Sequence, residues 1–320
     1  QLDLRPESRQ DVLLGASDHG HIDQGGHGGH EPVTLVEPFL LVGAGVRPGN
    51  YPDVNMVDIA PTLAALLGAS LPASSQGRVL TEMLDLPAET VQALPQALAA
   101  QQEQLLQAYT AAIGRSVEPV SGNPDGVGAY QAALQAARQA RLNAERLPRF
   151  ALALLAAALP LVWFWRQRRR EIGWFLGAGL VYLALFNLRY AVLEGRTYSL
   201  SSIYSANELI LFSAITAALA LLVTWLLFAL LRKLFRQTPR QASLWTLDLT
   251  LAVATLLLLP VMWSFALNGA LVTWTLPDFP SMFLGFLSLL QILVAPLVGL
   301  LLAAVAAVVA WAVKRLQPAH

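Results

Sequence analysis

The sequence contains no cysteine and few charged residues, and both shortages limit what the protein can be. Without cysteine, the 320 residues hold neither a disulfide framework nor a thiol nucleophile, although this absence does not identify the compartment. Only 13% of the residues are charged, 55% are hydrophobic, and the mean hydropathy is +0.52. A chain of this length with so little charge is too apolar for an ordinary soluble protein, so part of it is expected to lie in a membrane. The formal net charge of +0 gives no reason to expect nucleic acid as a binding partner.

Long apolar runs are confined to the second half of the chain. A membrane-spanning helix needs about 20 residues. The prolines within these runs kink a helix without excluding it, because neighbouring helices can satisfy the freed backbone groups. The sequence predicts five transmembrane helices, at about residues 147–165, 172–193, 209–231, 244–267 and 283–313.

Basic residues alternate between the loops of this region and predict its orientation. Ten lie in the loops or tail after the first, third and fifth runs, whereas Arg196 is the one basic residue in the other two loops. By the positive-inside rule, the C-terminus is cytoplasmic and the part of the chain before residue 147 is extracytoplasmic. Within the runs, Arg189 and Asp248 are costly unless they are paired or reach the interface, and anchoring is the favoured interpretation. A role in guiding a lipid substrate stays open.

Four of the five histidines fall within residues 17–30, among several glycines. Imidazole and carboxylate groups are ligands of zinc and similar divalent ions, and glycine allows a tight backbone to aim several ligands inward. Residues 11–17 before this stretch are predicted to form a buried strand, which would place Asp18 and His19 at its carboxyl end. The pattern therefore predicts a metal site. A glycine- and histidine-rich surface loop is the alternative.

The residues Ser17-Asp18-His19-Gly20, followed by Gly25, His27-Gly28 and His30, resemble the metal-binding segment of the alkaline phosphatase superfamily. Their spacing is similar to that of the glycosylphosphatidylinositol ethanolamine-phosphate transferases and related membrane-bound phosphodiesterases. The resemblance implies two divalent ions, zinc or manganese, with Asp18 and His19 on one ion and His27 on the other. His30 and His21 are possible metal or substrate contacts. It also implies that the nucleophile and the remaining ligands lie upstream, so the chain is expected to be an inactive C-terminal part of a longer protein.

After the glycine-rich stretch, residues 38–45 predict a second strand and residues 55–68 a short helix, with Asp58 as its N-cap and Gly68 at its end. This helix segment also resembles one that follows the metal loop in phosphatases, sulfatases and ethanolamine-phosphate transferases. Residues 88–113 and 128–146, rich in alanine and glutamine, predict two further helices that act as a spacer. The expected fold is the C-terminal part of an α/β alkaline-phosphatase-like domain (residues 1–86), a helical hairpin (87–146) and an all-α membrane bundle (147–320).

The function expected from these features is metal-dependent phosphoryl transfer or phosphodiester hydrolysis on the outer face of the cell membrane. No catalytic nucleophile is expected in this chain. The bilayer and a phosphodiester or phospholipid-type substrate are the expected partners, and the acceptor stays open. A sulfatase-like hydrolase is one alternative, although that branch typically carries Asp-Asn where this sequence has Asp18-His19. The other is a non-catalytic membrane protein with a degenerate metal domain.

Overall fold

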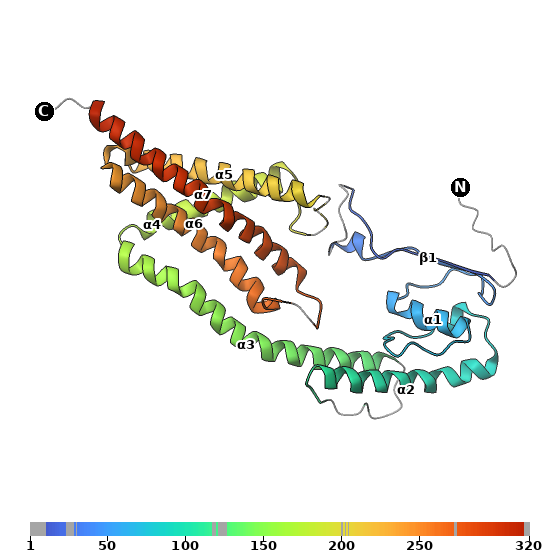
Figure 1. Cartoon of the computed structure of the whole chain (residues 1–320). Coiled ribbons are helices and arrows are strands. Elements are labelled where there is room, and N and C mark those ends of the chain that lie inside the picture. The colour runs from blue at the N-terminus through green and yellow to red at the C-terminus, as the bar shows by residue number, and fades with distance from the viewer. Residues whose placement is uncertain are drawn as a thin grey trace. The chain divides into compact units, whose positions relative to one another are not determined.

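The computed structural model describes residues 11–23, 29, 31–116, 120, 127–199, 201, 203, 205–271 and 274–316 (Figure 1). The chain divides into two compact units, one formed by residues 1–18 and 37–145 and the other by residues 19–36 and 146–320. Each unit has a hydrophobic core of its own. The longest helix, α3 (Val127–Arg168), begins in the first unit and continues into the second.

The first unit contains a two-stranded sheet. Strands β1 (Val12–Ala16) and β2 (Phe39–Gly43) pair antiparallel, with Val12 opposite Gly43 and Ala16 opposite Phe39. Both strands were predicted from the sequence, but as buried strands, and neither contains a buried residue. Among the described residues this small sheet is the only one, and two strands alone are marginally stable. The expected α/β architecture is therefore not confirmed.

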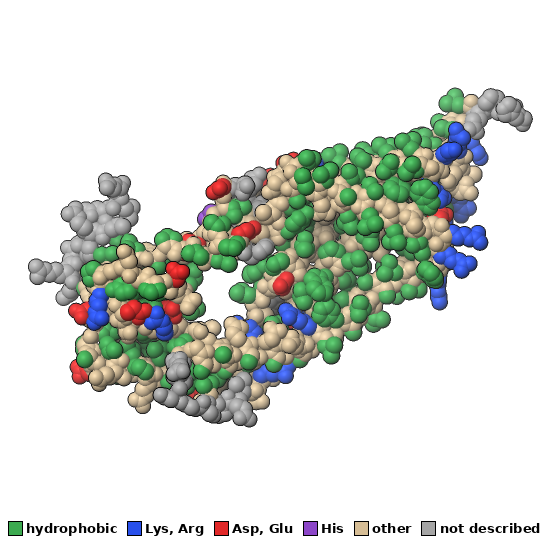
Figure 2. Space-filling view, turned by 180° about the vertical axis from the view of Figure 1, so that it is seen from behind, with side chains coloured by type: hydrophobic (Ala, Val, Ile, Leu, Met, Phe, Trp, Pro, Cys, Tyr) green, Lys and Arg blue, Asp and Glu red, His purple; other side chains and the backbone are tan. Residues whose placement is uncertain are grey.

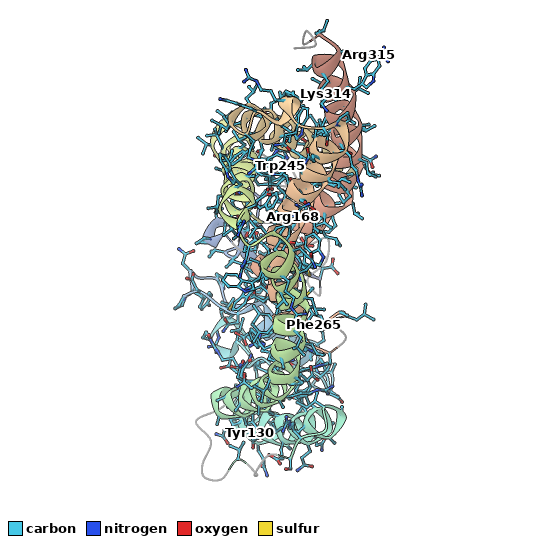
Figure 3. The ribbon with its side chains drawn as sticks, turned by 90° about the vertical axis from the view of Figure 1, so that its left-hand side faces the viewer. Tyr130, Arg168, Trp245, Phe265, Lys314 and Arg315 are labelled. Atoms are coloured by element: carbon cyan, nitrogen blue, oxygen red, sulfur yellow. The ribbon has the colours of Figure 1, made fainter. Side chains whose placement is uncertain are left out.

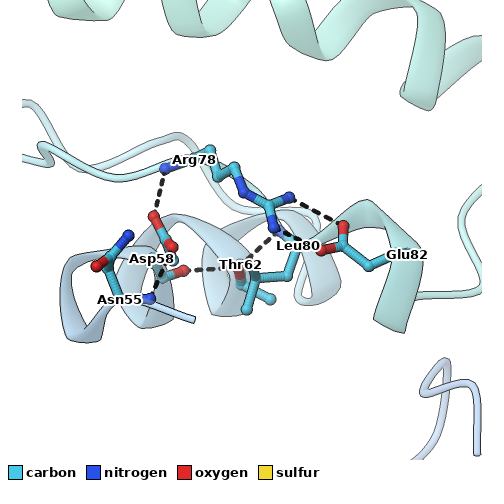
Figure 4. A network of polar contacts seen from close by, with 6 residues as sticks. All are labelled: Asn55, Asp58, Thr62, Arg78, Leu80 and Glu82. Atoms are coloured by element: carbon cyan, nitrogen blue, oxygen red, sulfur yellow. Dashed lines mark hydrogen bonds and ion pairs between the residues drawn. The ribbon is translucent and has the colours of Figure 1, made fainter. Parts of the chain in front are cut away.

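A network around Asp58 holds the segment that follows the sheet (Figure 4). The 3₁₀ turn η2 (Met56–Asp58) leads into α1 (Ile59–Leu66), and Gly68 follows with a left-handed φ of 64°. Asp58 is the N-cap residue of α1, as the sequence predicted, but its carboxylate makes no capping hydrogen bond to that helix. One oxygen accepts from the backbone N–H of Asn55 at 3.1 Å and the other from that of Arg78 at 2.8 Å. Asp58 thus ties the start of α1 to the backbone of Arg78, 20 residues later.

The same segment is held a second time, by Thr62 on α1. Its hydroxyl donates to the Asp58 carbonyl at 2.6 Å and accepts from the backbone N–H of Leu80 at 3.0 Å. Thr62 and Leu80 are 1% and 0% exposed, so water cannot reach them. Without this contact, the Thr62 hydroxyl would lose a donor and the Leu80 N–H would have no acceptor. A short turn, η3 (Thr81–Met83), follows, and its residue Met83 packs with Leu84 in the core of this unit.

A helical hairpin completes the first unit. Helix α2 (Ala88–Ala112) packs against the start of α3 through Leu106, Tyr130 and Leu134. The buried amides of Gln101 and Gln102 both donate to the backbone carbonyl of Ser75, at 3.1 and 2.8 Å. The hairpin predicted from the sequence is present. Its second helix, however, does not end near residue 146, because α3 is one continuous helix of 42 residues that includes the first apolar run.

In the described part of the chain, five helices are long and apolar enough to cross a membrane, as the sequence predicted, and they lie in the second unit except for the start of α3. Besides α3, these are α4 (Ile172–Asn187) with the π-helical turn η4 (Leu188–Leu193), α5 (Ala206–Leu231), α6 (Pro239–Asn268) and α7 (Phe279–Leu316). Two 3₁₀ turns, η1 (Pro32–Thr34) and η6 (Leu234–Arg236), lie in its loops. The length and composition of the five long helices fit a multi-pass membrane protein.

Helices α6 and α7 form the closest pair of the bundle and run side by side (Figure 1). Small residues allow this approach: a Cβ placed on Gly299 would lie 2.4 Å from the Thr250 side chain, and one on Gly285 would lie 2.7 Å from Cβ of Ser264. A hydrogen bond of 3.0 Å from the Tyr182 hydroxyl to the Gln291 amide oxygen joins α4 to α7. The helices are therefore held by close packing and by polar contacts between them.

Basic side chains gather at one end of this unit (Figure 2). Arg168 at the end of α3 pairs with Asp248 on α6 at 2.5 Å, and Arg232 at the end of α5 pairs with Glu171 at the start of α4 at 3.3 Å. Figure 3 is turned so that this end faces the reader. The sequence predicted that Asp248 needs a partner, and Arg168 is that partner.

Candidate functional site

The segment with the metal motif begins where β1 ends. Asp18 is exposed and closes the first unit, and His19 is half-buried and opens the second. The His19 Nδ1 lies 3.0 Å from the carbonyl oxygen of Gly20. A carbonyl only accepts, so this bond places the proton on Nδ1 and the lone pair on Nε2. Metal-binding histidines are commonly oriented by such a bond, in which one ring nitrogen donates to a backbone carbonyl.

The other predicted site residues differ in what can be said of them. His21 is exposed, and its ring centroid lies 5.0 Å from that of His19 at an interplanar angle of 51°. His27 and His30 lie outside the described residues. Within the part of the chain that the structure describes, no group of three or more His, Asp, Glu or Cys side chains could hold a metal ion. The assignment of Asp18, His19 and His27 as ligands thus stays a prediction.

The segment from His19 to Val36 is closed by its own backbone. Gly20 N–H donates to the carbonyl of Thr34 at 3.1 Å, which brings the two ends of the loop together. At the far end, the Thr34 hydroxyl donates to the carbonyl of Glu31 at 2.8 Å, and Thr34 is 3% exposed. The metal motif is therefore part of a loop with fixed ends.

Glu31 fastens this loop to the loop between α4 and α5. Its carboxylate accepts hydrogen bonds from the hydroxyl groups of Ser201 at 2.6 Å and Ser199 at 3.1 Å. Gly29 permits the approach, because a Cβ at that position would lie 2.8 Å from Cβ of Ser201. Burial raises the pKa of Glu31, but the hydrogen bonds from Ser201, Ser199 and Thr197 outweigh it and hold the pKa below its usual value.

The loop that receives Glu31 is itself held by aromatic and charged side chains. Arg196 pairs with Glu208 at the start of α5, and its guanidinium lies 4.2 Å from the centroid of the Phe212 ring. The Tyr198 ring stacks on Tyr190 with centroids 5.1 Å apart. Burial raises the pKa of Tyr198, so its hydroxyl stays protonated and donates to the side-chain oxygen of Asn187. The described residues just before Ser199 are thus tied to α4 and α5.

This contact was not predicted from the sequence. Glu31 was not among the predicted site residues, since a single glutamate beside a glycine-rich stretch is ordinary. Its partners lie 168 and 170 residues away, and no local pattern relates residues so far apart. The feature that could have drawn attention is the serine-rich composition of the loop around residues 199–205.

Replacing Glu31 by glutamine should loosen the metal-motif loop. The neutral amide accepts weaker hydrogen bonds from Ser199 and Ser201 than the carboxylate does. We expect the amide protons of Gly20 and Thr34 to exchange with solvent about tenfold faster, the equivalent of roughly 1.4 kcal/mol. Hydrogen exchange followed by mass spectrometry measures this.

The pH dependence should have the same cause. The folded-state pKa of Glu31 is lowered, so the stabilisation is present above the unfolded-state value near 4.5 and is lost as the pH falls through the folded-state pKa. Glu37→Gln is the matched control, because Glu37 lies in the same region without these serine contacts. Unchanged exchange in Glu31→Gln would show that other contacts hold the loop.

Two curated proteins are similar to parts of the chain. GPI ethanolamine phosphate transferase 1 of Mus musculus is 35% identical over an alignment of 87 residues, which covers 21% of this chain and 9% of that protein. Alkaline phosphatase PhoV of Synechococcus elongatus is 42% identical over 60 residues, covering 18% of this chain and 11% of that protein. No family model matches the sequence, and no solved structure matches it.

The chain thus spans about a tenth of the length of these two relatives. One relative is named as an ethanolamine phosphate transferase and the other as an alkaline phosphatase. The similarities therefore point to the alkaline phosphatase superfamily and to phosphoryl-transfer chemistry in a general sense. Neither relative is named as a sulfatase.

Proposed function

We propose that this chain is part of a metal-dependent enzyme of the alkaline phosphatase superfamily that transfers or hydrolyses phosphoryl groups at the outer face of a membrane. The observation that supports it most is the Asp18-His19-Gly20 motif directly after β1, with the Nε2 lone pair of His19 set by its bond to Gly20. The two partial similarities support the same chemistry. The five apolar helices suit a substrate that is itself a membrane lipid.

The side-chain chemistry of Asp18, His19 and His27 suits divalent metal ions. Asp18 would supply a carboxylate oxygen and His19 its Nε2 to one ion, and His27 would bind the other. Zinc and manganese both accept such ligands. When bound, a pair of ions polarises the phosphoryl group and stabilises the attacking and leaving oxygens.

This chain's own residues contribute position. The bond from His19 to Gly20 fixes the imidazole, and the contacts of Glu31 with Ser199 and Ser201 hold the motif loop on the membrane unit. Because this loop lies on the α4–α5 side of the unit, a phosphoester of a membrane lipid is the substrate class that we propose. A GPI-type lipid substrate is suggested by the name of one relative alone.

The experiment is a cleavage assay on the purified full-length protein. We expect it to cleave bis(p-nitrophenyl) phosphate. EDTA should lower the rate of cleavage by at least about tenfold, and added zinc or manganese should restore it. p-Nitrophenyl sulfate is the comparison substrate and should be cleaved far more slowly. Preferred sulfate cleavage would replace the proposal by a sulfatase, and no cleavage of either ester would favour a non-catalytic protein.

The orientation in the membrane is a second part of the proposal. The basic loops predict a cytoplasmic C-terminus and an external loop between α4 and α5. Glu194 is exposed, and the cysteine of a Glu194→Cys variant should react with an impermeant maleimide added to intact cells. The cysteine of a Gln167→Cys variant should react only after the cells are lysed. Ser201 is less suitable, since it is 1% exposed. The 320 residues contain no native cysteine that would confuse the labelling, and the reverse pattern would place the metal motif in the cytoplasm.

A further inference from the structure

An apolar cleft lies between α3, α4 and α6, near the end of the second unit where basic residues gather. It has a volume of about 210 Å³. Its lining includes Leu161 and Trp165 of α3, Ile172 and Leu176 of α4, and Leu256 of α6. The lining residue with a polar side chain, Thr255, donates its hydroxyl to the carbonyl of Leu251 at 2.8 Å. The cleft therefore offers a ligand mainly contact with hydrocarbon.

The cleft exists because α3 packs loosely on the bundle. In its most apolar stretch, 11% of the residues are buried, compared with 44% in α5. The side chains that line an empty cleft lose dispersion contacts, so a cleft that opens to the bilayer is expected to be filled. The molecules that surround it there are lipids, and an acyl chain has the apolar chemistry that matches this lining.

Three exposed arginines lie between the lining residues Trp165 and Ile172 in the sequence. Arg166 is in the last turn of α3, and Arg169 and Arg170 are in the turn before α4. The nearby carboxylates are already paired, Asp248 with Arg168 and Glu171 with Arg232. Among the described residues, no carboxylate lies within ion-pair distance of the three exposed arginines.

We propose that this cleft is a binding site for an anionic glycerophospholipid of the adjacent leaflet. One acyl chain lies between α3, α4 and α6, and the phosphate and the negatively charged headgroup lie against Arg166, Arg169 and Arg170. The apolar lining selects a lipid chain, and the unpaired positive charge selects a headgroup with net negative charge over a zwitterionic one. The site is separate from the metal motif and independent of the reaction proposed above.

The test uses the protein in nanodiscs of mixed phosphatidylglycerol and phosphatidylcholine, with bound lipid measured by native mass spectrometry. Wild type should retain phosphatidylglycerol in preference to phosphatidylcholine. Replacing Arg166, Arg169 and Arg170 together by glutamine should lower this preference by at least about tenfold. The matched control replaces three exposed basic residues of the α5–α6 turn, Lys233, Arg236 and Arg240, and should keep it.

A second pair of variants tests the position of the acyl chain. Ala252→Phe fills the cleft without changing charge and should lower the retention of phosphatidylglycerol, whereas Leu251→Phe on the exposed face of the same helix should not. Thermal unfolding in pure phosphatidylcholine checks that both variants fold. Equal losses in the two triple variants would show a general surface-charge effect and overturn the site. Full retention in a folded Ala252→Phe variant would overturn the placement of the chain.

Discussion

Replacing His27 by alanine in the full-length protein should remove most of one bound metal ion and lower phosphodiester cleavage by about a hundredfold or more. Loss of one of a few ligands opens the ion to water and weakens its retention, and even partners beyond the ligands cost 10–100-fold in such sites. Metal content by mass spectrometry of the purified protein and kcat/KM for bis(p-nitrophenyl) phosphate are the two measurements. The metal content is the more decisive measurement, because it does not depend on turnover.

Matched variants separate metal binding from general damage. His320→Ala removes a histidine far from the motif in sequence and should leave metal content and kcat/KM unchanged. Asp18→Asn should resemble His27→Ala, while Asp23→Asn changes an exposed carboxylate of the same stretch and should have little effect. Wild-type metal content and activity in both His27→Ala and Asp18→Asn would refute the assignment.

The membrane helices could be predicted because their signal is physical and local. A span must be about 20 apolar residues long, and the run predicted at residues 209–231 agrees with α5, Ala206–Leu231, to within three residues. The first run was harder. Near Leu147 the composition changes from Ala, Gln and Arg to Leu and Ala, and this was interpreted as the end of one helix and the start of another.

The structure has one continuous helix there because both compositions favour a helix. The change at Leu147 marks a change of surroundings and leaves the backbone unaltered. Even Pro148 and Pro160 do not end the helix. A proline removes one backbone N–H donor, and the carbonyl that loses this donor can be satisfied by neighbouring groups while the rest of the helix stays hydrogen-bonded.

The candidate site was only partly predictable. The motif from Asp18 to His30 was visible because it gathers metal-binding side chains in a short stretch, and the tautomer of His19 agrees with it. Asp58 was expected to cap its own helix, yet its carboxylate binds Asn55 and Arg78. The bonds of Asp58 to Arg78 and of Glu31 to Ser199 depend on how distant segments pack, which no periodicity records.

Breaking the ion pair between Arg168 and Asp248 should destabilise the membrane unit, and the two single replacements should differ. The atoms are 2.5 Å apart, and the side chains are 33% and 12% exposed. Arg168→Met leaves a short, buried carboxylate that cannot reach water, so we expect a loss of about 3 kcal/mol in the free energy of unfolding. Asp248→Leu leaves a long guanidinium that can extend towards the headgroups, so the loss should be smaller, about 1–2 kcal/mol.

The double replacement distinguishes a pair from two separate defects. With Arg168→Met and Asp248→Leu together, no charge is left unpaired and the gap is filled by apolar atoms. Stability should then return to within about 1 kcal/mol of wild type. Unfolding in mixed detergent micelles with increasing SDS measures all three variants. Asp85→Asn is the control, since its pair with Arg47 is 3.7 Å long and exposed and should contribute under about 0.5 kcal/mol. If the double variant lost as much as the sum of the single variants, Asp248 would be held by something other than Arg168, and the explanation for an acid inside this helix would fail.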